Sequence, residues 1–428
     1  MNGVILIKLL TSFNTSQALI EYSGAIGMFS KKTIRDADIK NRTVLVRVDY
    51  NVPLKDGQNG EKIVQDDTRI VASKPTIDYL ISQGCKIVLM SHLGRPKGER
   101  DPALSLKPVA LRASKVLGKP VRFCPVTVGE ESIRMAKGLK PGEILLLENL
   151  RYDKAETKND RKFSEKLSKL GDLYVNDAFG TAHRAHSSTV GVTEFLKPAL
   201  AGFLIEKELK YLGSALANPS RPFTAILGGA KVSDKIPVIN RLLDIVDNLI
   251  IGGGMMFTFI VAVGGEIGDS LIEVDKIESA KEFIARAKKT GKSIILPTDT
   301  IAAKEVLEDT EIKTFPANQI PSGWKGLDIG PLSVKKFKEI ILASRTIVWN
   351  GPMGVFELKP FANGTFEVAH AIADSGAVSI IGGGDSVSAI KKSGVSARVT
   401  HISTGGGASI EFLEGKELPG IAALDDKE

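Results

Sequence analysis

Short apolar patterns typical of strands alternate with helical patterns along most of the chain, and this alternation limits the fold more than any other feature. Thr43–Val48, Lys86–Met90 and Asp172–Val175 have the character of buried strands, and amphipathic stretches such as Asp67–Gln83 lie between them. Strands that alternate with helices at this spacing form a parallel sheet with helices on both faces. We therefore predict an α/β fold with a mostly parallel sheet.

The second half of the chain repeats this scheme. Helical patterns such as Lys276–Lys289 and Asn363–Ala373 separate six further expected strands. These strands are Phe223–Leu227, Asn248–Ile251, Ser293–Leu296, Thr346–Trp349, Val378–Ile381 and Val399–Ile402. Because 428 residues are too many for one hydrophobic core, we expect two domains of about 200 residues each.

A helix expected at 198–216 separates the two halves. Apolar residues fall on two of its sides, which is typical of a helix buried between two bodies. We expect residues 28–197 to form the first domain and residues 217–409 the second. Residues 1–27 contain one lysine and one glutamate and show no pattern that links them to the rest. We interpret them as a disordered or non-native extension.

Composition limits the class of protein but does not select the partner. The chain is 43% hydrophobic and 25% charged, which is typical of a soluble globular protein. A formal net charge of +7 permits an anionic partner and leaves nucleic acid, a membrane surface and a phosphorylated metabolite open. Cys85 and Cys124 have no CxxC spacing, so we expect neither a zinc site nor a disulfide framework. A reducing, cytoplasmic compartment follows from this.

Basic and polar residues gather at or just after the expected strand ends of the first half. They are Asp49, Asn51, His92, Arg95, Arg151 and Arg184, and Arg69 at the start of the next helix can join them. In open α/β sheets the functional crevice lies beyond the carboxyl ends of the strands. A guanidinium group binds two oxygens of a phosphate or carboxylate at once, and Asp49 and Asn51 would bind hydroxyl groups of the ligand. The pattern predicts a site for a small, highly charged anion.

Three histidines belong to the same cluster: His92, His183 and His186. A general base or a metal site is conceivable for them. No carboxylate-rich triad and no HxxH spacing accompanies them in the sequence. We therefore expect them to act as donors to phosphate.

Glycine clusters mark the second half, each where a strand gives way to a helix. They are Gly228-Gly229-Ala230-Lys231, Gly252-Gly253-Gly254, Gly351-Pro352-Met353-Gly354, Gly382-Gly383-Gly384-Asp385-Ser386 and Gly405-Gly406-Gly407. Glycine lets backbone N–H groups approach a phosphate, and a helix N-terminus adds its positive end. Neither a P-loop nor a GxGxxG pattern with its acidic partner is present in the sequence. We therefore expect a nucleotide site of another kind.

Side chains near these clusters suit a nucleotide bound with magnesium. Lys231 and Lys235, which would lie one helical turn apart, are expected to bind phosphate. Asp385 would be a ligand of Mg²⁺, and Glu357 would bind a ribose hydroxyl.

Several segments, taken together, resemble the signature segments of the phosphoglycerate kinase family. They are Arg47–Pro53, Ser91–Pro96, Glu148–Arg151, Ala178–Ser188, Leu227–Lys235, Val348–Glu357, Gly382–Ser386 and Ser403–Ser409. The resemblance runs in order from about Phe29 to the C-terminus. Tyr50 stands where the family commonly has phenylalanine, and Met256 where it has a smaller residue.

The resemblance implies ATP-dependent, reversible phosphoryl transfer from 1,3-bisphosphoglycerate to ADP, which gives 3-phosphoglycerate and ATP in glycolysis. It further implies a monomer of two Rossmann-like domains, joined by an interdomain helix and closing on their substrates. The C-terminal tail, 410–428, would return to the first domain. By matching motifs, 3-phosphoglycerate would be held by Asp49, Asn51, Arg69, His92, Arg95, Arg151 and Arg184. The nucleotide would be held by Lys235, Gly326, Asn350, Glu357, Gly383, Gly384, Asp385 and Ser386.

Such a transfer needs in-line positioning and neutralisation of charge on the transferring oxygens, with no covalent intermediate. Arg69, Lys231, Mg²⁺ on Asp385 and the backbone N–H groups around Gly384 and Gly406 could supply this. We expect no other metal and neither nucleic acid nor membrane as a partner.

Two other functions are weighed against this one. A nucleotide-dependent dehydrogenase would need the missing GxGxxG pattern, and a test for cofactor-linked absorbance change would decide it. A basic nucleic-acid-binding protein would need aromatic residues interleaved with lysine and arginine, but aromatic residues make up only 6% of the chain. A salt-titrated oligonucleotide binding assay would detect it.

Overall fold

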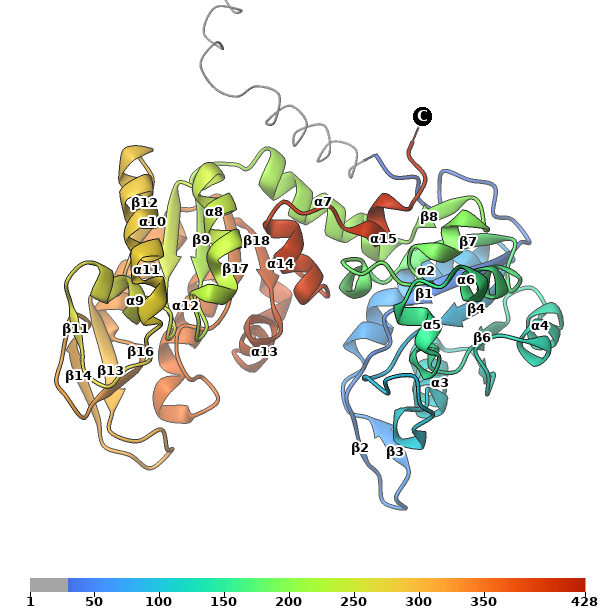
Figure 1. The fold of residues 1–428 in the computed structure, drawn as a ribbon, viewed down its shortest axis with the longest axis horizontal. Helices are drawn as coiled ribbons and strands as arrows, with labels where there is room; N and C mark the ends of the chain where they lie inside the picture. Colours follow the sequence, from blue (N-terminus) through green and yellow to red (C-terminus); the bar gives the residue numbers. More distant parts are fainter. Residues whose placement is uncertain (1–29, 428) are drawn as a thin grey trace, which may run out of the picture. The chain divides into compact units, whose positions relative to one another are not determined.

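The computed structural model describes residues 30–427, which form two compact units (Figure 1). The first unit contains the described residues up to Gly213 together with those from Glu417 onward, and the second runs from Ser214 to Lys416. The extension expected at 1–27 lies outside the described residues. Each unit contains a parallel sheet, and the predicted α/β class is confirmed.

A six-stranded parallel sheet forms the centre of the first unit, in the order β5-β6-β4-β1-β7-β8. Its strands are β1 (Thr43–Val48), β4 (Lys86–Met90), β5 (Val121–Phe123), β6 (Ile144–Leu146), β7 (Leu173–Asp177) and β8 (Ala199–Ala201). From β1 the chain leads to β4 on one side, whereas from β7 it leads to β8 on the other. Such a reversal opens a crevice beyond the carboxyl ends of β1 and β7.

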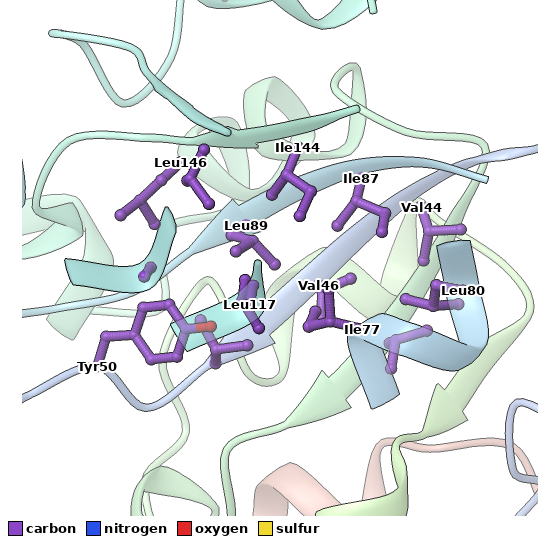
Figure 2. Packing of buried hydrophobic residues seen from close by; sticks show 14 of the residues in the cluster. Val44, Val46, Tyr50, Ile77, Leu80, Ile87, Leu89, Leu117, Ile144 and Leu146 are labelled. Carbon is purple, nitrogen blue, oxygen red and sulfur yellow. The ribbon is translucent and has the colours of Figure 1, made fainter. Parts of the chain in front are cut away.

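Helices pack on this sheet through apolar side chains. Figure 2 shows Val46 of β1 close to Ile77 and Leu80 of α2, all fully buried. The longer helices of the unit are α2 (Thr68–Ser82), α3 (Lys107–Leu117), α4 (Glu130–Lys137) and α6 (Arg161–Ser168), and α5 (Lys154–Thr157) and α15 (Pro419–Ala422) are single turns. Burial of these faces is the main source of stability for a sheet of this kind.

The second unit repeats the arrangement with the strand order β12-β10-β9-β17-β18-β19, again all parallel. The strands are β9 (Phe223–Leu227), β10 (Asn248–Ile251), β12 (Ser293–Ile295), β17 (Thr346–Asn350), β18 (Val378–Gly382) and β19 (His401–Ile402). The helices are α8 (Ile236–Ile245), α9 (Met256–Ala262), α10 (Ile277–Lys289), α11 (Pro331–Ala343), α12 (Asn363–Asp374), α13 (Gly384–Lys392) and α14 (Gly407–Leu413). Here the reversal falls between β9 and β17.

Small additional sheets were not predicted from the sequence. They are the hairpin β2 (Leu54–Asp56) with β3 (Lys62–Val64), the pair β11 (Glu266–Ile267) with β15 (Gln319–Ile320), and the antiparallel sheet of β13 (Asp299–Ala303), β14 (Ile312–Pro316) and β16 (Lys325–Ile329). Several of these strands are only two or three residues long, and β14 is largely exposed. Neither feature leaves a clear apolar period in the sequence.

The helix expected at 198–216 begins later than predicted. Ala199–Ala201 pairs with β7 as the edge strand β8, and the helix α7 runs from Phe203 to Ala217. The apolar residues of this strand also fit the helical pattern of the residues that follow it. The division between the two units falls within α7, after Gly213.

The C-terminal residues from Glu417 belong to the first unit. The Lys31 ammonium group donates hydrogen bonds to the backbone oxygens of Ala422 and Leu424, at 3.1 and 3.0 Å. The sequence predicted that the C-terminal tail joins the first domain from residue 410 onward. In the structure α14 still packs on α8 within the second unit, and the tail joins the first unit only from Glu417.

No helix among residues 30–427 combines the length and the apolar character that crossing a membrane requires.

The first turn of α7 is held by two buried groups of the first unit. The Phe203 N–H donates to Thr76 Oγ1 at 2.8 Å, and the Leu204 N–H donates to Asp177 Oδ1 at 2.9 Å. Both bonds satisfy donors that have no partner within the helix. Burial raises the pKa of the Asp177 carboxyl to about 7, which the Thr76 hydroxyl and the backbone N–H groups only partly oppose.

We expect Asp177→Asn to remove part of the pH dependence of stability. With a raised pKa in the folded state, wild-type Asp177 keeps its proton from about pH 4 to pH 7 while the unfolded chain loses it, so stability falls over this range. Asparagine carries no such proton. The free energy of unfolding of the variant, relative to wild type, should therefore rise by on the order of a few kcal/mol between pH 4.5 and pH 7.5.

Urea unfolding, followed by hydrogen exchange in peptides of the first unit, measures this difference without assuming that both units unfold together. Parallel pH curves for the two proteins would contradict the assignment.

Candidate active site

An aspartate and an arginine meet beyond the end of β1. Asp49 follows the strand and is 8% exposed. Arg69 lies in the first turn of α2, and its Nη1 donates to Asp49 Oδ2 at 2.8 Å and to the Asn51 backbone oxygen at 3.2 Å. These bonds hold the guanidinium at the mouth of the crevice, where its remaining donors can bind a ligand.

The loop after β4 is fixed to its neighbours through Gly94. The Gly94 N–H donates to Asn51 Oδ1 at 2.9 Å, and its backbone oxygen accepts from Arg151 Nη1 at 2.8 Å. Gly94 has a φ of +62°, which a residue with a side chain rarely adopts. The turn therefore brings Asn51, Arg95 and Arg151 to one place from three strand ends.

Three arginines line one cavity of about 520 Å³. Its lining residues are Arg95, Lys97, Gly98, Arg151, Asp153, Lys154, Thr157, Lys158, Arg184 and His186. Burial and the neighbouring cations lower the pKa of Arg151 to about 10 and that of His186 to about 4. A bound anion would relieve this repulsion, so the cavity suits phosphate or carboxylate groups.

His92 lies deeper in the same cluster and is 4% exposed. Burial, followed by the charges of Arg47 and Arg151, holds the pKa of its ring well below the usual value. Its Nδ1 lies 3.1 Å from Arg47 Nη2. His92 is therefore a neutral ring, which agrees with the expectation of a hydrogen-bond donor more than with that of a general base. The third histidine, His183, accepts through Nε2 from Arg184 Nε at 3.1 Å.

In the second unit, glycine turns cross at the reversal between β9 and β17. A Cβ at Gly228 would lie 2.1 Å from the Pro352 backbone oxygen. A Cβ at Gly253 would lie 2.5 Å from the Gly229 backbone nitrogen, and its φ is +65°. Contacts this close are possible only without side chains. The glycines therefore let three strand ends share one crevice.

Lys235 and Asn350 form the polar part of this crevice. The Lys235 ammonium donates to Asn350 Oδ1, and burial lowers the pKa of Lys235. Within the described residues the buried Asn350 Nδ2 has no hydrogen-bond partner, so a donor remains for a ligand. Lys231 is exposed nearby. The sequence predicted a spacing of one helical turn between the two lysines, but α8 begins only after a 3₁₀ turn at Ser233–Lys235.

The turn after β18 combines positive backbone dihedrals with a helix start. Gly383 has a φ of +85°, and Gly384 is the first residue of α13. Asp385 is exposed in the first turn, whereas Ser386 is buried. Ser386 Oγ accepts from the Gly351 N–H at 2.6 Å, so this hydroxyl ties two glycine turns together.

The remaining residues expected to bind the nucleotide lie on separate segments. Gly326, in β16, donates its N–H to Ser270 Oγ at 2.9 Å, and a Cβ there would lie 2.2 Å from Phe257 Cζ. Glu357 is exposed beside a cavity of about 460 Å³. Gly406, with a φ of +52°, precedes α14.

Charged residues that sequence reasoning did not assign also belong to the first crevice. Lys154 lines the cavity, and its side chain packs where a Cβ of Gly98 would lie. Arg47 and Glu156 are fully buried behind the cavity. A charged residue inside the apolar strand Thr43–Val48 was a usable signal for Arg47, because buried charges need partners. Glu156 gives no such signal.

Within residues 30–427, no three His, Cys, Asp or Glu side chains lie close enough together to hold a metal ion by themselves. Asp385 offers a single carboxylate, which fits the habit of Mg²⁺ to bind one or two carboxylates together with substrate phosphates.

Comparison with known proteins gives consistent matches. The family model described as phosphoglycerate kinase matches residues 34–416. A phosphoglycerate kinase from Clostridium tetani is 56% identical over 402 residues, which cover 93% of this chain and 99% of that protein. One from Thermosipho africanus is 54% identical over 401 residues, which cover 93% and 98%. The solved structure of the Coxiella burnetii phosphoglycerate kinase has a TM-score of 0.83 at 39% identity, covering 92% of this chain and 98% of that one.

We expect Gly253→Ala to weaken binding of ADP by about tenfold or more, because the new methyl group displaces the Gly229 backbone and its donors. Isothermal titration calorimetry measures this affinity. Gly264→Ala is the matched control: Gly264 also has a positive φ, of +89°, but its Cβ would meet nothing within 4 Å. That variant should lose about 1 kcal/mol of stability and bind ADP normally. If both variants bind ADP with equal affinity, the close approach of Gly253 to the Gly229 backbone has no role in binding ADP.

Proposed function

Because the chain belongs to the phosphoglycerate kinase family, and so transfers a phosphoryl group between 1,3-bisphosphoglycerate and ADP, we propose how its two crevices divide the reaction. The proposal rests mainly on the cavity that Arg95, Arg151 and Arg184 line. A phosphorylated three-carbon acid binds in this cavity, and the nucleotide binds at the glycine crossing of the second unit. The activity belongs to glycolysis and gluconeogenesis.

The first crevice binds 3-phosphoglycerate through groups of three kinds. Arg95, Arg151 and Arg184 bind the phosphate group, and the pKa of Arg151, lowered by burial and by the charges of Arg47 and Arg184, supports this role. His92 adds a neutral donor. Asp49 and Asn51 hold and orient the rest of the molecule, and both are themselves fixed by the hydrogen bonds described above.

The second crevice binds the nucleotide. Lys235, Asn350 and the N-terminal turn of α13 with Gly383, Gly384 and Ser386 bind its phosphates. Gly326 and Glu357 bind the base and the ribose. The unpartnered Asn350 Nδ2 and the lowered pKa of Lys235 support this assignment.

Catalysis depends on positioning and on neutralising charge, because a phosphoryl group moves between a carboxylate and ADP without a covalent enzyme intermediate. Arg69 and Lys231 donate to the transferring oxygens. The backbone N–H groups at Gly384 and Gly406 add to this charge stabilisation. Closure of the two units, with α7 as the connecting element, brings the ligands together and excludes water that would otherwise accept the phosphoryl group.

Asp385 would hold Mg²⁺ together with the nucleotide phosphates, and the ion would offset the negative charge of those phosphates. We further propose that the protein acts as a cytoplasmic monomer, with neither nucleic acid nor membrane as a partner. Sedimentation analysis tests the monomer.

We expect Arg69→Ala to lower kcat about 100- to 1000-fold, because the variant lacks a donor to the transferring oxygens. The affinity for ATP should change little, because Arg69 belongs to the first unit. A coupled assay of ATP formation from 1,3-bisphosphoglycerate and ADP measures kcat, and calorimetry measures the affinity.

Two control variants separate this role from structural effects. Arg69→Lys keeps a cation beside Asp49 but loses the fork geometry, and should still lose most of the activity. Arg42→Ala removes an exposed arginine whose Nε lies 3.8 Å from Asp172 Oδ2, and this variant should have the activity of wild type. Near-normal turnover of Arg69→Ala would refute the assignment.

We expect Asp385→Asn to raise the Mg²⁺ concentration needed for half-maximal activity by about tenfold, because the site loses its carboxylate. A titration of the coupled assay with Mg²⁺ measures this. An unchanged Mg²⁺ requirement would exclude Asp385 as the ligand.

A further inference from the structure

Two fully buried charged residues lie behind the arginine cavity and are joined by one serine. Arg47 lies on β1 and Glu156 on α5, and both are 0% exposed. Arg47 Nε donates to Ser188 Oγ at 2.9 Å. The Ser188 hydroxyl donates to Glu156 Oε1 at 2.5 Å, and the Ser188 N–H donates to Oε2 at 3.0 Å. The carboxylate, the hydroxyl and the guanidinium therefore form a chain with a fixed direction.

The far end of this chain is His92. Arg47 Nη1 donates to the Val48 backbone oxygen, and Nη2 lies 3.1 Å from His92 Nδ1. A guanidinium can only donate, so Nδ1 must accept and the ring proton must sit on Nε2. Asp49 Oδ1, at 4.0 Å from the same Nδ1, is beyond hydrogen-bond distance.

Other charged groups around this chain do not replace its members. His186 Nδ1 lies 3.8 Å from Glu156 Oε1, which is too long for a hydrogen bond. Burial raises the pKa of Glu156, while Arg47 and the two donors of Ser188 favour its ionised form. With Ser188 removed, Arg47 Nε would lose its partner, and the guanidinium would keep only its contacts through Nη1 and Nη2.

We propose that Ser188 and Glu156 are positioning residues that orient Arg47 and thereby fix His92 as the tautomer with its proton on Nε2. The pocket then presents one neutral donor of fixed direction beside its cations. The effect on substrate rests on the proposed function, whereas the tautomer does not.

The test compares two adjacent buried serines. Ser188→Ala breaks the chain. Ser187→Ala is the matched control, because Ser187 is equally buried and its hydroxyl donates to the Ala155 and Asp160 backbone oxygens instead. Nitrogen-15 spectra of the five histidine rings, with His92 assigned through His92→Gln, report which ring nitrogen carries the proton.

At pH 7.5 we expect wild type and Ser187→Ala to show His92 with an acceptor Nδ1 and a protonated Nε2. Ser188→Ala should show signals averaged over the two neutral tautomers. The same variant should raise KM for 3-phosphoglycerate about tenfold, with KM for ATP unchanged, because an oriented hydrogen bond to a charged ligand is lost. In a protein that already carries His92→Gln, Ser188→Ala should raise KM for 3-phosphoglycerate no further, because both substitutions act through the His92 ring.

A wild-type His92 with its proton on Nδ1 would overturn the proposal even if no variant folds. Identical His92 spectra in both serine variants would overturn it as well. Absence of kinase activity in the wild-type protein would instead contradict the proposed function and leave the spectra interpretable.

Discussion

The order of parallel strands determines where the functional side chains of each unit lie. In both sheets a central pair of strands sends its connections in opposite directions, β1 with β7 in the first unit and β9 with β17 in the second. Helices cannot cover the gap between connections that diverge, so a crevice remains at the carboxyl ends of the pair. The residues paired at these ends, Val48 with Asp177 and Leu227 with Asn350, are followed directly by the loops that line each crevice.

The two crevices differ in the kind of donor that they offer to an anion. The first concentrates side-chain cations, and burial together with the neighbouring positive charges lowers the pKa values of Arg151 and His186. The second removes side chains, so that backbone donors around Gly228 and Gly253 can approach a ligand. Cationic side chains suit a small ligand that is surrounded on several sides, whereas exposed backbone N–H groups suit a chain of phosphates.

Buried polar contacts carry the geometry of the first crevice. Asp49, Asn51 and Arg69 bind one another, and Gly94 links the loop after β4 to the loops after β1 and β6. A buried polar group without a partner is costly, so these loops cannot shift independently. Sites built in this manner are held in shape before the ligand arrives, which limits the reorganisation that binding requires.

The sequence alone predicted the α/β class and the positions of the long strands, because apolar periods are local properties. It also brought Asp49 and Arg69 into one predicted site, since parallel strands end at one edge of a sheet. It could not predict where α7 starts, because the short apolar segment Ala199–Ala201 is compatible with a buried strand and with a turn of helix. Nor could it find Glu156, whose role depends on contacts with residues more than thirty positions away. Tertiary structure alone decided these points, because pairing and burial depend on which segments meet in space.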